Sequence, residues 1–199
     1  REVATKVGDA TQIVALTTNG SATLLPYKQA IVTVTPQAGQ SLTSININVK
    51  NTTSGLQAYE TGWLDIEVGS PNFTSITLGG SNVRFAMCER AAVRSFGSDT
   101  NQSNLFENFR ELQEVVLGNT ASVTNMSSMF LNCISLVTLP LFSTAACTNM
   151  SAMMFQCTSL TTVPLFNTAA CTNMSEMFRQ CRSLTTIPLL NTAAVTNMI

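Results

Sequence analysis

Histidine is absent from the 199 residues of this chain, and charged residues make up only 11% of it. Without histidine, the chain lacks the commonest general base and the commonest metal ligand of proteins. The sequence also has no Cys-x-x-Cys pair and no Gly-rich phosphate loop. We therefore predict a protein that is not an enzyme, with no catalytic residues, no metal site and no cofactor.

A strong charge of either sign and a long apolar run are also missing. The net charge is −1, and no apolar run approaches the roughly 18 residues that a membrane span requires. The first residues, REVATKVGD, contain no apolar core of a signal peptide. Arg84, Arg90 and Arg94 come close together, but we interpret them as a solvated face. We expect neither nucleic acid nor membrane insertion.

What the sequence does contain is one motif repeated from residue 119 to residue 199. Asn125, Asn149, Asn173 and Asn197 recur every 24 residues, each within a Thr-Asn-Met triplet. Self-similarity at such a period is typical of stacked repeats. The fourth copy is incomplete, so we expect this chain to be a segment of a longer polypeptide.

Each repeat suggests a short helix followed by a short strand. Met126, Met129, Phe130 and Cys133 have the spacing i, i+3, i+4, i+7 of one helical face, which Thr124 or Asn125 would cap. An L-x-x-L-x-L strand follows, with its leucines directed inward. Proline cannot donate to a strand ladder, so the prolines within this motif indicate strand ends. They are Pro140, Pro164 and Pro188. The predicted fold class is an α/β repeat solenoid, a leucine-rich-repeat-like right-handed coil of short helix plus short parallel strand.

The rest of the chain divides into two predicted parts. Residues 1–70 contain short β-branched runs between turn signals, which favour a small all-β N-terminal domain or anchor with antiparallel strands. Residues 71–118 contain degenerate first repeats: RELQEVVLG as one strand and Phe73–Leu78 as another. Between them, an insert at about 79–99 predicts an amphipathic capping helix through Phe85, Cys88, Ala92 and Phe96. Residues 119–199 are the clear repeats, truncated in the fourth.

The pattern V/C-T-N-M-S-x-M-F-x-x-C-x-S-L-T-x-[ILV]-P-L resembles the BspA-like leucine-rich repeat family of bacterial and mycoplasma surface proteins. The resemblance is strong over residues 100–199, loose over 70–99 and absent over 1–69. It implies a surface-exposed, non-enzymatic protein that binds other cells, matrix or host molecules. It identifies no ligand-binding residue in this sequence, because the matching motif forms the framework of the repeats rather than a binding site.

Cysteines and acidic residues are the remaining candidates for chemistry. Cys133, Cys157 and Cys181 form one ladder, and Cys147 and Cys171 another. Equivalent positions hold Val or Phe, so we predict reduced cysteines that pack in the core. Asp65 and Glu67 alternate on one predicted strand. They could hold a cation, but solvated strand-face residues are the simpler interpretation.

The predicted binding surface is the exposed strand face of the repeats. We place Thr161, Thr162, Thr185 and Thr186 on it, with Phe142 and Phe166 beside them. Two alternatives stay open for Phe142, Phe166 and Leu190: they contribute to the surface, or they turn inward and leave a plain wall.

Two functions fit these features. The first is an extracellular or cell-surface adhesion module, whose leucine-rich-repeat arm recognises a protein or glycan receptor. The alternative is a structural component of a larger particle, such as a phage virion fibre or decoration protein, contacting neighbouring subunits. In either case the N-terminal region could support a homo-oligomer.

Overall fold

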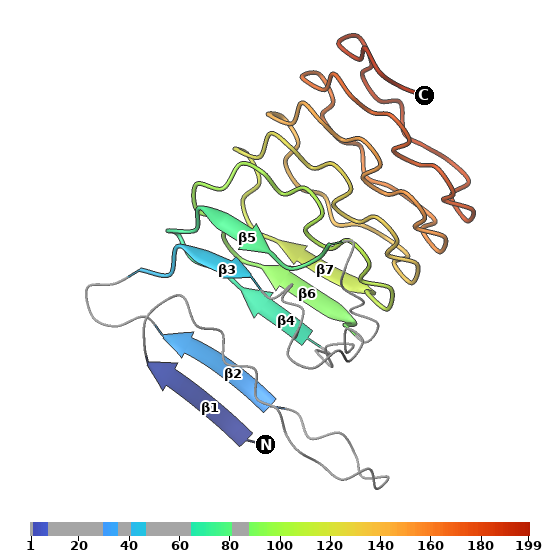
Figure 1. Ribbon diagram of the computed structural model, residues 1–199. Coiled ribbons are helices and arrows are strands. Elements are labelled where there is room, and N and C mark those ends of the chain that lie inside the picture. Colours follow the sequence, from blue (N-terminus) through green and yellow to red (C-terminus); the bar gives the residue numbers. More distant parts are fainter. Residues whose placement is uncertain (1, 8–29, 36–40, 47–64, 81–87) are drawn as a thin grey trace, which may run out of the picture.

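The computed structural model describes residues 2–7, 30–35, 41–46, 65–80 and 88–199 (Figure 1). The predicted strand TQIVAL, at residues 11–16, lies outside these ranges. So do Arg84 and Phe85, with which the predicted capping helix begins. The division of the chain at residues 70 and 118 stays a prediction.

The described residues form seven short strands in three small sheets. Every pairing among them is parallel, so the predicted antiparallel arrangement is wrong for this part of the chain. The chain makes a long return between paired strands, as parallel pairing requires. β1 pairs with β2, β3 with β5, and β6 lies between β4 and β7. The strands are β1 (Glu2–Val7), β2 (Ala30–Thr35), β3 (Ser44–Asn46), β4 (Asp65–Val68), β5 (Ser75–Thr77), β6 (Arg90–Val93) and β7 (Glu114–Leu117).

The sheet β4-β6-β7 corrects the prediction of a capping helix. Residues 90–93 form β6, the middle strand, in register with Asp65 on one side and Glu114 on the other. Ala91, Ala92 and Val93 are buried there. A helix over these residues would leave both neighbouring strands without their backbone partners, so pairing overrides the helical spacing. The predicted strands within RELQEVVLG and Phe73–Leu78 are present as β7 and β5.

After Leu117, successive 24-residue units lie one on another without any helix or strand, as the looping trace from yellow to red shows (Figure 1). Single parallel bridges join Asn101, Asn125, Asn149, Asn173 and Asn197 in turn. We call residues 101–109, 125–133, 149–157 and 173–181 the turn wall. We call β4, β6, β7 and segments 136–141, 160–165 and 184–189 the strand wall.

Backbone hydrogen bonds in the turn wall alternate between two kinds of partner. Met126, Ser128 and Phe130 donate to the carbonyls 23 residues further along the chain, each at 2.9 Å. The intervening N–H groups of Met129, Leu131 and Cys133 donate three residues back, at 3.1–3.2 Å. Half of the donors thus close local turns and the other half join one unit to the next. An α-helix would direct all of these donors four residues back along its own chain.

Positive φ angles at fixed positions exclude the predicted helices. Ser128 and Asn132 have φ of 55° and 63°, and the equivalent Ala152 and Gln156 have 51° and 61°. A right-handed helix requires negative φ, whereas the third residue of a type II turn requires positive φ. Consecutive turns therefore bring Met126, Met129, Phe130 and Cys133 to one side, where all four are buried. The predicted buried stripe is confirmed, but the helix is wrong.

The core lies between the two walls and runs along the stacked units. Leu112, Leu136 and Leu160 are fully buried at the same position of successive units. The rings of Phe106 and Phe130 stack with centroids 5.4 Å apart. Because each unit buries its apolar side chains partly against the next, the core depends on neighbouring units.

The predicted fold class is therefore wrong. An α/β coil needs a helix on one wall and a strand on the other, and the described residues contain no helix and no strand beyond Leu117. The turn wall replaces the helices. Proline at residues 140, 164 and 188 lacks the N–H that a strand ladder would use, which explains why the strand wall is unpaired there.

Candidate functional site

The four predicted threonines are all exposed on the strand wall. Thr161 and Thr162 belong to one unit, and Thr185 and Thr186 to the next. Thr161 donates both its N–H and its Oγ1–H to the carbonyl of Val137, at 3.0 and 3.2 Å. These two hydrogen bonds to the preceding unit hold the side chain in place. A binding role for these threonines stays a prediction.

Phe142 and Phe166 lie inside rather than on that surface. They are 8% and 2% exposed, and their ring centroids are 5.1 Å apart. Phe142 also contacts Phe130, at 6.4 Å between centroids. Leu190, at the equivalent position, is partly buried against the core. Of the two alternatives for this ladder, the structure shows the inward one.

Three leucines occupy the surface instead, contrary to the prediction that they face inward. Leu141, Leu165 and Leu189 are 73%, 63% and 96% exposed. Strict alternation would place Leu141 inside with Leu139, but Leu139 and Phe142 are the buried pair. Both residues between them, Pro140 and Leu141, therefore lie outside. We call these three leucines, with Thr161, Thr162, Thr185 and Thr186, the Leu–Thr row.

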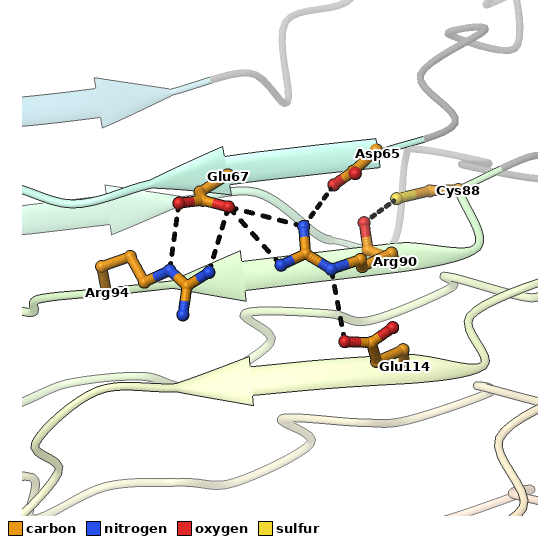
Figure 2. A network of polar contacts seen from close by, with 6 residues as sticks. All are labelled: Asp65, Glu67, Cys88, Arg90, Arg94 and Glu114. Atoms are coloured by element: carbon orange, nitrogen blue, oxygen red, sulfur yellow. Dashed lines mark hydrogen bonds and ion pairs between the residues drawn. The ribbon is translucent and has the colours of Figure 1, made fainter.

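Charged side chains gather at the other end of the strand wall (Figure 2). Arg90 Nη1 lies 2.9 Å from Asp65 Oδ1, and Arg90 Nε lies 3.3 Å from Glu114 Oε1. These residues are paired in register on β4, β6 and β7, so one guanidinium links three strands. Glu67 accepts hydrogen bonds from Arg94 Nε and Nη2 at 3.0 and 3.2 Å. The positive charges beside Asp65 and Glu67 are thus the guanidinium groups of Arg90 and Arg94.

The electrostatics of this cluster follow from those contacts. Hydrogen bonds from Arg94 lower the pKa of Glu67, and Arg90 acts in the same direction. The hydrogen bond to Asp65 raises the pKa of Arg90. Because the side chains are partly exposed, their ion pairs contribute little each. Each carboxylate of the cluster already lies against a guanidinium, so most of its charge is compensated from within. Its alternating signs, at Asp65, Arg90 and Glu114, were missed because Arg90 was assigned to a helix.

All six cysteines are free, and five of them are buried. Cys133 and Cys157 donate their thiol protons to the carbonyls of Phe106 and Phe130, at 3.2 and 3.1 Å. Burial raises the pKa of Cys88 to about 12 and that of Cys147 to about 11. A thiol held protonated is a poor nucleophile and a poor metal ligand. The predicted packing role is confirmed.

The repeated asparagines act in turns rather than as helix caps. Asn125 Oδ1 accepts the N–H of Ser127 at 3.0 Å, and Asn149 and Asn173 accept from Ser151 and Ser175 in the same way. Such Asx turns fix the entry into the turn wall. The side-chain oxygen of each of these Asn-x-Ser sequences is therefore engaged with the backbone.

Neither a metal cluster nor a membrane-spanning helix is found in the described part of the chain. No three Cys, Asp or Glu side chains in these ranges gather closely enough to hold a metal ion. The same residues include no helical segment with the length and hydrophobicity needed to cross a bilayer. The most distinctive surface is the Leu–Thr row, in which exposed apolar and hydroxyl side chains recur unit by unit.

Comparison with known proteins gives one match. Residues 100–199 match the model of a family described as "Mycoplasma protein of unknown function, DUF285". No curated protein matches the chain. No solved structure matches it either. Because the matched residues make up half of the sequence, the chain belongs to the Mycoplasma protein family of unknown function DUF285.

Proposed function

We propose that this chain is a non-enzymatic binding module of an extracellular surface, and that the Leu–Thr row contacts a protein on another surface. The observation that carries the proposal is the exposure of Leu141, Leu165 and Leu189 on one wall. Large apolar side chains that recur together at the surface are typical of interaction sites, whereas single ones are common everywhere.

The composition of the row favours a protein as its partner. The apolar leucines provide the non-directional part of the contact, and the hydroxyls of Thr162, Thr185 and Thr186 can meet backbone groups of the partner. Between Asn119 and Ile199 the only charged residues are Glu176, Arg179 and Arg182. Glu176 and Arg179 form an ion pair with each other. Association through the row should therefore depend weakly on salt.

The resemblance of the repeats to BspA-like proteins supports the same proposal. That family implies surface-exposed proteins that bind cells, matrix or host molecules, and the family matched by residues 100–199 is related to it. The relation concerns the repeated sequence and does not extend to a leucine-rich-repeat fold.

The test compares the row with the turn wall. The double variant Leu165→Ser/Leu189→Ser removes most of the apolar surface of the row without touching a buried residue. Glu176→Gln, on the turn wall, is the matched control. Both proteins and the parent would be immobilised and exposed to intact host cells and to purified extracellular-matrix proteins.

We expect the parent and the control to bind, and the double variant to lose about tenfold or more in affinity. Absence of binding by the parent, or equal binding by the double variant, contradicts the proposal. Co-purification with particle proteins in a fixed ratio from the native source would instead favour the structural role in a virion.

A further inference from the structure

A polar hollow lies between β5 and the first turn-wall segment, and none of its lining residues belongs to the Leu–Thr row. Its volume is about 530 Å³. One side is formed by residues 74–80 and the other by residues 99–107. Most of its lining is polar: Thr74, Ser75, Thr77, Asp99, Asn101, Ser103, Asn104 and Glu107.

A mismatch between neighbouring segments explains why the hollow exists. In the regular turn wall, the donor and acceptor of each inter-unit bond stay 23 residues apart, as from Gln102 to Asn125 and from Asn108 to Leu131. Ile76 N–H donates to Asp99 Oδ2, which is also 23 residues ahead. Gly80 N–H, however, donates to the carbonyl of Glu107 at 3.4 Å. The short segment 76–80 therefore lies opposite the longer segment 99–107. The additional residues of the longer segment leave space between the two.

Four of the polar side chains around the hollow are available for a ligand. Ser75, Thr77, Ser103 and Asn104 have no side-chain hydrogen bond within the described ranges. Other hydroxyl side chains of the repeats are engaged: those of Thr120, Thr144 and Thr168 each donate a hydrogen bond to the neighbouring unit. The hollow therefore presents hydroxyl and amide groups in a concave arrangement, close to one another.

The charges of the lining restrict the kind of ligand. Among the described residues that line the hollow there is no Lys or Arg, which disfavours phosphates and other anions. Both oxygens of Asp99 are already engaged, by the N–H groups of Ile76 and Asn101 at 2.9 and 3.0 Å. Glu107 is the remaining carboxylate, and burial raises its pKa. Glu107 Oε1 accepts only a long hydrogen bond, of 3.4 Å, from Asn108 Nδ2. A single carboxyl group among neutral donors and acceptors suits vicinal hydroxyls, because each carboxyl oxygen has more than one lone pair with which to accept.

We propose that this hollow binds a neutral saccharide, with Glu107, Asn104 and Ser103 hydrogen-bonding adjacent hydroxyl groups. This site goes beyond the proposed function, because it shares no residue with the Leu–Thr row. The protein would then possess two recognition surfaces: an apolar row for a protein and a polar hollow for a sugar.

The experiment titrates the full chain with glucose, galactose, mannose, N-acetylglucosamine and lactose up to about 10 mM, followed by amide NMR, which detects millimolar affinities. Glucuronate serves as the anionic probe. We expect at least one neutral sugar to shift the amides of residues 99–107, and glucuronate to bind about tenfold more weakly. Failure of every neutral sugar, or equal binding of glucuronate, overturns the proposal.

Two variants establish the location. Glu107→Gln keeps the size of the side chain and its contact with Asn108, and should weaken sugar binding about tenfold. Ser103→Leu fills the hollow and should abolish binding. Leu165→Ser/Leu189→Ser should leave sugar binding unchanged, so the two proposals fail separately. The Ser103→Leu protein counts as folded if it unfolds at the same temperature as the parent. If that folded variant binds sugar as the parent does, the sugar binds elsewhere and the assignment is overturned.

Discussion

The strand wall is constructed differently at its two ends, although the chain direction is the same in both and equivalent residues lie 24 or 25 residues apart throughout. In the first three units, β4, β6 and β7 pair in register and Arg90 joins their side chains. In the last three, Pro140, Pro164 and Pro188 interrupt the ladder and the surface is uncharged. Contacts between units are therefore dense in the strand wall early in the stack and sparse there later, whereas the turn wall joins units from residue 101 onward.

This change has a consequence for the outer surface. Where strands pair, outward side chains are bound to one another, as Asp65, Arg90 and Glu114 are. Where proline breaks the alternation, leucines and threonines are left facing solvent. The late units can expose an apolar row because their stability comes from elsewhere. The buried hydroxyl of Thr144, which donates to Asn167 at 2.9 Å, is one such contribution.

The largest expected effect comes from placing a charge on either side of the late strand wall. Leu160 is fully buried, so Leu160→Asp would introduce an unpaired carboxylate into the core and should lower the free energy of unfolding by about 4 kcal/mol or more. Leu165→Asp, in the same unit, introduces the same group at a position that is 63% exposed. We expect a change within about 0.5 kcal/mol for that variant.

Urea unfolding followed by circular dichroism measures both variants. Their difference is the informative quantity, because the substitution is chemically identical and only its direction in the wall differs. Comparable losses in the two variants would contradict the inward and outward assignments.

A smaller effect is expected where an early unit departs from the late ones. Gln102 is fully buried, and its Oε1 has no partner among the described residues. The equivalent position holds a buried methionine in the next three units, at residues 126, 150 and 174. Gln102→Met removes an unpaired buried oxygen and sacrifices one long bond, of 3.3 Å, to the carbonyl of Asp99.

We expect Gln102→Met to raise the free energy of unfolding by about 1 kcal/mol. Gln102→Glu is the matched opposite change, since it keeps the shape and adds charge, and it should destabilise strongly. Thermal unfolding of the two variants beside the parent provides the measurement. A destabilised Gln102→Met protein would mean that the amide is satisfied in solution.

Features that follow from the 24-residue repeat could be predicted from the sequence, whereas features that depend on backbone φ angles could not. The 24-residue period correctly aligned Asn125, Asn149 and Asn173, and it identified the buried positions of Met126, Cys133 and Leu160. Burial of a side chain requires only that it recur on one side. Many local conformations satisfy that requirement, so the pattern does not determine which one forms.

The main error concerns conformations that share an apolar pattern. The spacing i, i+3, i+4, i+7 occurs both on a helix and on consecutive turns, and the positive φ of Ser128 and Ala152 has no signal in their residue types. The exposure of Leu141 depends on a local break in alternation. Arg90 joins β4, β6 and β7, although the sequence predicted a helix at residues 90–93 and placed the other two strands in separate parts of the chain. The polar hollow arises from a mismatch in segment length, which no short motif records.

The smallest expected effect concerns the ion pairs of the early strand wall. The folded state lowers the pKa of Glu67 below its ordinary value of 4.5, chiefly through the hydrogen bonds of Arg94. A carboxylate with a lowered folded-state pKa contributes stability above the unfolded-state value, and this contribution disappears as the pH falls through the folded-state value. Glu67→Gln should therefore flatten the dependence of the urea midpoint on pH between about pH 6 and about pH 3.

Arg94→Met tests the cause, because it leaves Glu67 and its weaker contact with Arg90 in place. We expect it to flatten the same pH dependence in part, and the double variant to match Glu67→Gln, since both changes remove one interaction. An unchanged slope in Arg94→Met would show that Arg90 is the effective partner. If neither single variant changes the pH dependence of the urea midpoint, these exposed ion pairs add no stability to the early strand wall. Backbone pairing of β4, β6 and β7 would then be the whole difference in stability between the early and the late strand wall.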